Sequence, residues 1–365
     1  MQTITTLEIG GAPRERGRQY GAGLKALIRA RDAAWRKSLT AQTGRPSDEV
    51  IHALVSGTDF ISAVRRFTPD LLEEVHGIAE GAGLSFEAIY AAQLMDEEWW
   101  IIADEKGHHH CSSLGVVQPR GPALAAQTMD LVDWNEGYQV LLTVRGENGA
   151  PDQLVTTMAG MIGLCGMTSA GLGVVVNTLS QLAVSRAGLP VAFVSRGVLS
   201  QGDHDGAVAF LKCVPHASGQ NYIVADPLKI TDLECSAAGA VPHSGGASCV
   251  WHTNHPLAST DLRGGAHDHV ASMKNSKGRL AVLDGKLGDV AVPSVADVKR
   301  LLANRDDAAD PIARRLGEHG SHAFTFASVV YELSPEPKVH VAPGPACSTP
   351  FRTYDFSPAK RAAAE

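Results

Sequence analysis

The chain has 365 residues, of which 44% are hydrophobic and 19% charged, a balance typical of a globular protein with a substantial core. Its formal net charge of −7 is mild, and no Lys/Arg cluster with interleaved aromatic residues stands out, which argues against nucleic-acid binding. No apolar run is long enough for a membrane span, and the first residues do not resemble a signal peptide, so we expect a cytoplasmic protein without membrane or nucleic-acid partners.

The first third of the chain is predicted to be mainly helical. After a strand at 3–9, a helix begins at Pro13, a residue that suits a first turn, and runs toward Lys37. Gly17 and Gly21 lie four residues apart on one face of this helix. Because glycine costs helix stability, we expect both to permit close packing against another element.

Two more helices are predicted before the pattern changes. The first has Thr68 as its N-cap and Pro69 in its first turn, and it ends near 81–83. Ser85 caps the second, which continues toward Trp100.

From Leu114 onward, short apolar or alternating runs separated by Gly, Pro and Asp predict strands. The predicted strands are 138–144, 154–158, 173–179, 221–225 and 249–253, with a closing hairpin at 325–333 and 338–341. Helices are predicted at 191–199, 205–211 and 295–304. Since neither an internal repeat nor a long linker divides the chain, the simplest packing is one α+β domain, 1–365, with strands facing each other inside helical layers.

The glycine-rich stretch 160–173 is not predicted to bind phosphate. It lacks the Gly-Lys-Ser/Thr ending of a P-loop, and no GxGxxG motif opens a helix after a strand. We interpret it as tight antiparallel strands joined by a turn at Thr168–Gly171, and we expect no cofactor.

Cys111 is the strongest functional signal. It follows three histidines, precedes two serines and lies where the helical pattern gives way to strands. The ordinary interpretation of a single cysteine is a buried, inert thiol. At this junction, however, self-cleavage could make the cysteine a new N-terminus, and its free α-amine would then act as the base for its own thiol.

Asn254 is the second candidate, in the run His252-Thr253-Asn254-His255. An asparagine just past a strand end can direct its amide N–H into a site and hold a developing oxyanion. The alternative is an asparagine that only forms a turn.

A metal site was weighed against this interpretation. Cys249, His252 and His255 have a spacing that zinc could use. Adjacent residues such as His109 and His110 point apart on an extended chain, and no Cys-x₂-Cys pair supports a closed site. We therefore expect no metal.

Seven motifs occur in an order that resembles one known family. They are Arg14-x-x-Gly17-x-x-x-Gly21; Glu74-x-x-Gly77-Ile78-Ala79-x-Gly81; Cys111; Gln127-x-x-Asp130; Gly163-x-x-Gly166-Met167-x-Ser169-Ala170-Gly171; Asn221-Tyr222-x-x-Ala225-Asp226; and His252-Thr253-Asn254-His255. The ordered set resembles the acyl-coenzyme A:6-aminopenicillanic acid acyltransferase (isopenicillin-N acyltransferase-like) family, over nearly the whole chain.

The resemblance implies an N-terminal-nucleophile hydrolase fold, with two antiparallel sheets between helical layers (αββα). It also implies self-cleavage between His110 and Cys111 into an N-terminal chain, 1–110, and a C-terminal chain, 111–365. Cys111 then matches the nucleophile, Asn254 the oxyanion-hole residue, and Ser113 the hydroxyl residue two places after the nucleophile. Asp130 matches an aspartate near the substrate pocket.

Three departures from the family pattern concern the substrate more than the fold. His110 stands where the penicillin enzyme has glycine, and Thr128 and Met129 replace Asn and Trp. Ser321 and His322 stand where that enzyme has a Ser-Arg pair for a substrate carboxylate, and histidine can replace the arginine charge only when protonated.

The sequence therefore predicts a self-processing cysteine amidohydrolase that cleaves a small N-acyl amine or peptide-like amide through an acyl-thioester. One alternative is an acyl-coenzyme A-dependent N-acyltransferase, although no basic cluster suited to the nucleotide phosphates stands out. The other is a non-enzymatic binding or metal-binding protein on the same scaffold. The expected partners are the small amide substrate and the two chains of one precursor, and a homo-oligomer stays open.

Overall fold

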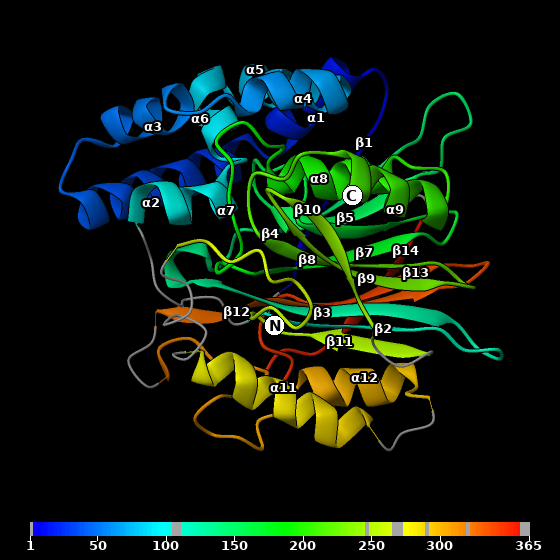
Figure 1. Ribbon diagram of the computed structural model, residues 1–365. Coiled ribbons are helices and arrows are strands. Elements are labelled where there is room, and N and C mark those ends of the chain that lie inside the picture. Colours follow the sequence, from blue (N-terminus) through cyan, green and yellow to red (C-terminus); the bar gives the residue numbers. More distant parts are fainter. Residues whose placement is uncertain are drawn as a thin grey trace.

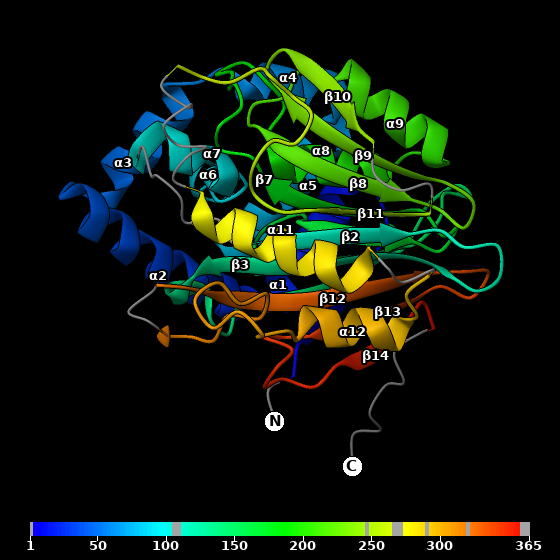
Figure 2. The same cartoon turned by 60° about the horizontal axis from the view of Figure 1, so that its bottom comes forward.

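Two β-sheets lie face to face between layers of helices in the computed structural model (Figure 1 and Figure 2). The structure describes residues 3–103, 111–244, 248–264, 273–288, 292–318 and 322–357. Most of the helices that precede Cys111, together with α8 (Val191–Leu199) and α9 (His204–Cys213), lie on the outer side of one sheet, and α11 (Lys274–Leu287) and α12 (Val295–Leu302) cover the other (Figure 1). This four-layer αββα arrangement confirms the predicted fold class.

The chain before Cys111 folds mainly as helices (blue to cyan in Figure 1). They are α1 (Pro13–Gly23), α2 (Lys25–Thr43), α3 (Ser47–Ser56), α4 (Phe60–Phe67), α5 (Pro69–Ala82), α6 (Phe86–Ala91), α7 (Met95–Glu98) and the π-helical turn η1 (Trp99–Ala103). The single helix predicted from Pro13 to Lys37 is wrong: Leu24 leaves the helical conformation directly after Gly21 and Gly23, which weaken the last turn of α1. The helix predicted from Ser85 toward Trp100 is likewise divided, into α6, α7 and η1.

The glycines of α1 confirm the expected close packing. A Cβ atom on Gly17 would overlap the carbonyl oxygen of Glu74 in α5, and a Cβ on Gly21 would overlap that of Ile78. The contact is reciprocal, because a Cβ on Gly77 of α5 would overlap the carbonyl oxygen of Arg14. The backbones of α1 and α5 are therefore in contact over two turns, and a residue larger than glycine at these positions would force the helices apart.

We expect Gly17→Ala to destabilise the protein by at least about 1–3 kcal/mol, because the added methyl group meets backbone atoms that cannot rotate away. Urea unfolding measures the effect. Gly285→Ala in α11 is the matched control, since a Cβ there has no neighbour within 4 Å among the described residues. Equal unfolding midpoints for Gly17→Ala and the wild type would contradict the packing argument.

The first sheet is mixed rather than fully antiparallel. Its spatial order is β1 (Thr5–Ile9), β4 (Gln139–Val144), β5 (Gln153–Met158), β6 (Cys165–Thr168), β7 (Gly173–Thr178), β8 (Gln220–Ala225), β9 (Ile230–Ser236) and β10 (Gly239–His243). β1 pairs with β4 in parallel, which corrects the expectation of two antiparallel sheets. The helical region separates β1 from β4 in sequence, so no hairpin turn imposes an antiparallel orientation on this pair.

The second sheet is antiparallel throughout its described pairs. Its spatial order is β11 (Cys249–His252), β2 (Ser112–Val116), β3 (Ala123–Val132), β12 (Ala323–Leu333), β13 (Lys338–Ala342) and β14 (Arg352–Asp355). The β12–β13 hairpin confirms the predicted closing hairpin. The glycine-rich stretch forms the antiparallel pair β6–β7, with Gly171 at a positive φ of 85° in the turn, as expected.

Alternation along β2 decides what faces the space between the sheets. Leu114 and Val116 pack into a core cluster with Leu283 of α11. A Cβ on Gly115 would instead meet Ile223 and Ile230 of the opposite sheet. Because strand side chains alternate, Ser113 shares the face of Gly115, which lies between the two sheets, and Cys111 directly precedes the strand in the same alternation.

Candidate active site

Cys111 lies at the start of β2 and lines a small cavity between the two sheets. Its exposed fraction is 9%, and the cavity has a volume of about 30 Å³, room for about two water molecules. Most of its walls are apolar, and two carboxyl groups, Asp96 and Asp130, also line it. Helix α7 and the η1 turn, both from the segment before Cys111, contribute Met95, Asp96 and Trp99. Both segments predicted to separate on cleavage therefore build this cavity.

Arg279 joins Cys111 to Asn254. This side chain is fully buried on α11, and its Nη1 donates hydrogen bonds to the carbonyl oxygen of Cys111 and to Ser112 Oγ. Its Nη2 donates to Asn254 Oδ1 at 2.9 Å. Burial lowers the pKa of Arg279 to about 10, although Asp130 and Cys111 oppose that shift. The guanidinium thus remains a cation at neutral pH and fixes both predicted catalytic residues relative to each other.

The Asn254 amide is held in one orientation. Arg279 can only donate, so Oδ1 must face it, and Nδ2 donates to the carbonyl oxygen of Thr178 at 2.9 Å. The Thr178 hydroxyl in turn donates to Asp96 Oδ1 at 3.0 Å. Since Nδ2 carries two hydrogens, one remains for an oxyanion. The structure brings Asn254 to Thr178, a wall of the Cys111 cavity, and its oxyanion role stays a prediction.

Asp130 faces the same cavity from β3 and is also buried. Burial raises the pKa of this carboxyl to about 7, against the opposing effects of the Thr325 hydroxyl, Arg279 and Arg314. Arg314 Nε lies 4.0 Å from Asp130 Oδ2. Asp130 therefore lines the same cavity as Cys111 and can gain or lose a proton near neutral pH, while its substrate-binding role stays a prediction.

The Cys111 thiol is strongly disfavoured as a thiolate in the uncleaved chain. Burial raises the pKa of this thiol to about 12, and the nearby Asp130 carboxylate raises it further, while an Asp130 backbone hydrogen bond and Arg279 act in the opposite direction. A nucleophilic role therefore needs a base close to Cys111.

Ser113 is buried, and its hydroxyl has no hydrogen-bond partner among the described residues. It pairs with Gln127 of β3 and with His252 of β11 in the sheet register. Its position on the inter-sheet face fits the predicted catalytic role, which stays a prediction.

Of the predicted carboxylate-binding pair, His322 is not among the described residues that line the Cys111 cavity. The side chain of His322 is 81% exposed, and its Nδ1 lies 2.8 Å from Asp133 Oδ2, so the imidazole already faces a carboxylate of the protein. Ser321 and His110 lie outside the described residues.

The two histidines of the possible zinc site are engaged elsewhere. His252 Nε2 lies 2.9 Å from Glu234 Oε1, and its Nδ1 lies 2.7 Å from the carbonyl oxygen of Thr253. His255 Nδ1 lies 2.7 Å from Ser276 Oγ. In the part of the chain that the structure describes, no group of three or more His, Cys, Asp or Glu side chains is arranged to hold a metal ion.

Glu234 stabilises the loop that follows Asn254. Besides its contact with His252, its carboxylate accepts the backbone N–H groups of Leu257, Ala258 and Ser259. Burial raises the pKa of Glu234, but the contact with His252 and, to a smaller extent, the backbone hydrogen bonds of Leu257 and Ser259 outweigh it and lower this pKa. Sequence reasoning missed Glu234, Arg279 and Thr178, because each acts only through contacts with residues far away in the chain.

Asp130 should make the uncleaved chain lose stability as the pH rises. Its folded-state pKa of about 7 exceeds the ordinary value of 3.8, so between those values the folded chain binds the proton more tightly and the unfolding free energy falls with pH. Thermal unfolding of Cys111→Ala, which lacks the thiol predicted to start cleavage, should give a lower melting temperature at about pH 8 than at about pH 5.

Adding Asp130→Asn to that chain should shrink the difference between the two melting temperatures, since the amide does not titrate. Asp48→Asn is the control, because the Asp48 side chain is 89% exposed. An unchanged difference with Asp130→Asn would contradict the assigned protonation.

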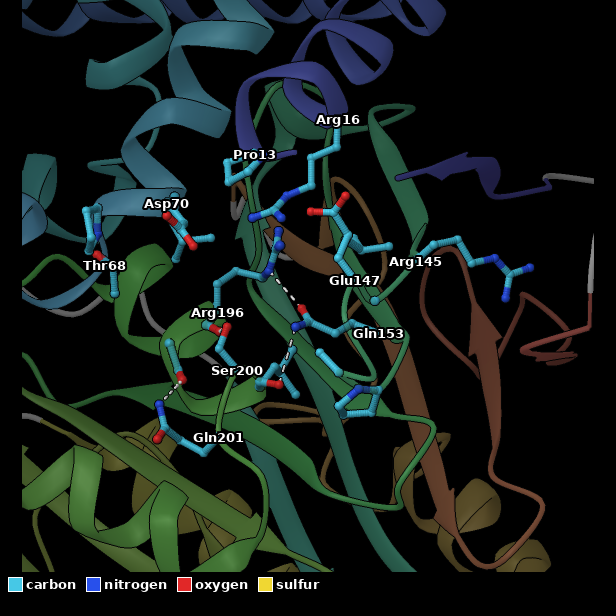
Figure 3. A pocket seen from close by; sticks show the side chains of 18 of the residues that line it. Pro13, Arg16, Thr68, Asp70, Arg145, Glu147, Gln153, Arg196, Ser200 and Gln201 are labelled. Carbon is cyan, nitrogen blue, oxygen red and sulfur yellow. Dashed lines mark hydrogen bonds between the residues drawn. The ribbon is translucent and has the colours of Figure 1, made fainter. Parts of the chain in front are cut away.

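A larger pocket, of about 380 Å³, lies elsewhere, between α1, α5, the β4–β5 connection and α8 (Figure 3). Its arginines are paired within the protein. Arg196 binds the buried Glu74 and also donates to Gln153, Arg16 binds the same glutamate, and Arg145 binds Asp152. The pocket does not include Cys111, so the candidate active site is the smaller cavity.

Solved structures similar to this chain include three enzymes. An N-acylethanolamine-hydrolyzing acid amidase ortholog from Caenorhabditis elegans has 15% identity and a TM-score of 0.44, covering 60% of this chain and 92% of that one. A mutant conjugated bile acid hydrolase from Clostridium perfringens has 13% identity and a TM-score of 0.42, covering 67% and 92%. Penicillin V acylase from Agrobacterium tumefaciens has 14% identity and a TM-score of 0.35, covering 67% and 86%.

The family comparison covers most of the region that builds the site. The model described as acyl-coenzyme A:6-aminopenicillanic acid acyl-transferase matches residues 123–342, more than half of the chain. This span includes Asp130, Thr178, Asn254 and Arg279. Among the described helices, none has the length and apolarity needed to cross a membrane. The chain belongs to the acyl-coenzyme A:6-aminopenicillanic acid acyl-transferase family.

Proposed function

We propose that the chain is a self-processing cysteine amide hydrolase that cleaves a small N-acyl amine through an acyl-thioester on Cys111. The observation that carries the proposal is the link between Cys111 and Asn254 through the buried guanidinium of Arg279. The thiol lines a small, largely apolar cavity, and the oriented amide of Asn254 donates to Thr178, a wall of that cavity; a nucleophile near an oriented donor supports acyl transfer as the function.

Self-cleavage is the first step of the proposal. The Cys111 thiol attacks the carbonyl carbon of His110, the peptide bond breaks, and the acyl group of the N-terminal segment passes from nitrogen to sulfur. The freed nitrogen takes the thiol proton. Asp130, which lines the same cavity and has a pKa of about 7, is placed to carry this proton. Water then hydrolyses the thioester and leaves two chains, 1–110 and 111–365.

The new α-amine supplies the base that the uncleaved chain lacks. A free α-amine has an ordinary pKa of about 7.7–8.0, so a useful fraction is unprotonated near neutral pH. It takes the thiol proton, the thiolate attacks the substrate carbonyl, and Asn254 Nδ2 with a backbone N–H holds the oxyanion. The ammonium returns its proton to the leaving amine, and water, deprotonated by the same amine, releases the acid.

Acyl-enzyme trapping tests this function. The processed protein is incubated with p-nitroanilides of straight-chain carboxylic acids of increasing length, and p-nitroaniline release is followed by its absorbance. Mass spectrometry of quenched samples should find the acyl group on the 111–365 chain. If no chain length gave either p-nitroaniline release or acylation of the protein, that result would contradict the proposal.

The same experiment separates hydrolysis from acyl transfer, which the family's description suggests as a second function. A hydrolase produces free acid at the rate at which amine is released. An N-acyltransferase instead takes its acyl group from an acyl-coenzyme A and gives it to an added amine, leaving little free acid. An assay with acyl-coenzyme A as the sole acyl donor, run with and without 6-aminopenicillanic acid as the acceptor amine, decides between hydrolysis and acyl transfer.

A further inference from the structure

A second cavity adjoins the Cys111 cavity, and Met95 and Trp99 line both. Its volume is about 20 Å³. β3 passes from one cavity to the other, since Leu131 lines the first and Val132 the second. A ligand seated at Cys111 would therefore reach the second cavity if these shared walls moved apart slightly.

Arg31 of α2 lines this second cavity and is a buried cation whose side chain donates no hydrogen bond within the described part of the chain. Its exposed fraction is 3%, its Nε has no hydrogen-bond partner, and its guanidinium donates no hydrogen bond to any described residue. A guanidinium has five N–H donors, so leaving them unused in a buried site is costly. Arg31 therefore differs from the buried Arg196 and Arg279, whose donors are engaged.

Two indole rings hold the Arg31 guanidinium in place. Its Cζ lies 5.9 Å from the ring centroid of Trp35 and 5.7 Å from that of Trp134. Such rings attract the cation through their faces but accept no in-plane hydrogen bond from it. Glu98 is nearby and stabilises the charge, but its Oε2 accepts a hydrogen bond from Trp35 Nε1 at 2.8 Å.

We propose that Arg31 binds a carboxylate at the end of the substrate that lies away from the scissile amide. This inference rests on the proposed function. A planar carboxylate matches the guanidinium fork and would satisfy two of its donors at once. The substrate class is then an N-acyl amine with one anionic end, whose apolar middle passes Met95 and Trp99. His322, predicted for this role, faces Asp133 instead.

Matched substrate pairs test the inference in the processed enzyme. The first pair carries the charge on the acyl part: an ω-carboxyacyl p-nitroanilide and its ω-carboxamide, built on the chain length that the acyl-enzyme experiment finds best. The second carries it on the leaving amine, at the far end of a methylene chain: the corresponding N-acyl-6-aminohexanoate and its carboxamide. In one pair, we expect kcat/KM to favour the carboxylate by about 10- to 100-fold, the scale of a hydrogen bond to a charged group.

Arg31→Gln should remove that preference by lowering kcat/KM for the carboxylate while leaving the carboxamide unchanged. Arg31→Lys should keep part of it, because the charge remains but the fork is lost. Arg29→Gln is the matched control on the same helix, with an exposed side chain that binds the carbonyl oxygen of Gly83. A purely structural role for Arg31 would lower turnover of both members of a pair alike.

Equal kcat/KM within both pairs in the wild type, or a preference that survives Arg31→Gln, would overturn the inference and leave the proposed function intact. If Arg31→Gln does not fold, competitive inhibition of the wild type decides: glutarate should inhibit more strongly than glutaramide, and equal inhibition would overturn the inference. Absence of both p-nitroaniline release and acyl-enzyme with all p-nitroanilides overturns the proposed function itself.

Discussion

Cys111→Ala should abolish both self-cleavage and amide turnover while the uncleaved chain stays folded. The substitution removes the only atom of the protein proposed to attack a carbonyl, and it removes only one heavy atom from a buried position. Gel electrophoresis would show a single full-length chain, and circular dichroism would show wild-type secondary structure. Activity should fall below detection, because both the nucleophile and the cleavage that frees its base are lost.

Cys111→Ser separates the two roles of this residue. The hydroxyl keeps an attacking oxygen but is a weaker nucleophile, so cleavage should be slow or absent and turnover much reduced. Cys213→Ala is the control, since that cysteine is exposed on α9. Turnover by Cys111→Ala near the wild-type rate would remove the physical basis of both the cleavage site and the catalytic base.

Asn254→Ala should lower kcat by roughly 10²–10³-fold, the scale measured for the loss of one oxyanion donor. The protein should still fold, because Arg279 retains its hydrogen bonds to Cys111 and Ser112. Steady-state kinetics on the processed variant measures the effect, which should fall on kcat more than on KM.

Asn254→Asp separates two roles of this residue: the N–H donor to an oxyanion and the acceptor of the hydrogen bond from Arg279. Aspartate can still accept the hydrogen bond from Arg279 but has no amide N–H to offer an oxyanion. We expect a loss at least as large as that of Asn254→Ala. If Asn254→Asp or Asn254→Ala turned substrate over at nearly the wild-type rate, Asn254 would be only a turn residue.

The sequence predicted the parts of the fold that depend on local pattern. Pro69 and the Gly83 end of α5, the β12–β13 hairpin and the β6–β7 turn all follow from neighbouring residues. The parallel pairing of β1 with β4 could not be predicted this way, because it joins strands separated by the whole helical region. The break at Leu24 was missed for a different reason: the helical period continues through it, although Gly21 and Gly23 weaken the turn.

The residues of the candidate site also differ in whether a local sequence pattern or a long-range contact identifies them. Cys111 and Asn254 stand at points where the local pattern changes, and the resemblance to a family added Asp130, so the sequence marked all three. Arg279 lies on α11, a helix that was not predicted. Its importance comes from a contact with Cys111 across 168 positions of the chain, which no local pattern encodes.

Arg31 is a similar case. In the sequence it is one of several arginines on a charged, amphipathic helix, and it differs from Arg29 only in the face that it occupies. The structure distinguishes the two, because Arg31 is buried between Trp35 and Trp134 and has no hydrogen bond among the described residues.

The most direct test of the account is intact-mass analysis with N-terminal sequencing of wild-type protein whose amide turnover has been measured on the same sample. We predict two chains, 1–110 and 111–365, with Cys111 as the new N-terminus and activity proportional to the cleaved fraction. Full activity from protein that runs as a single uncleaved chain would contradict it, because Cys111 would then have no α-amine to act as its base.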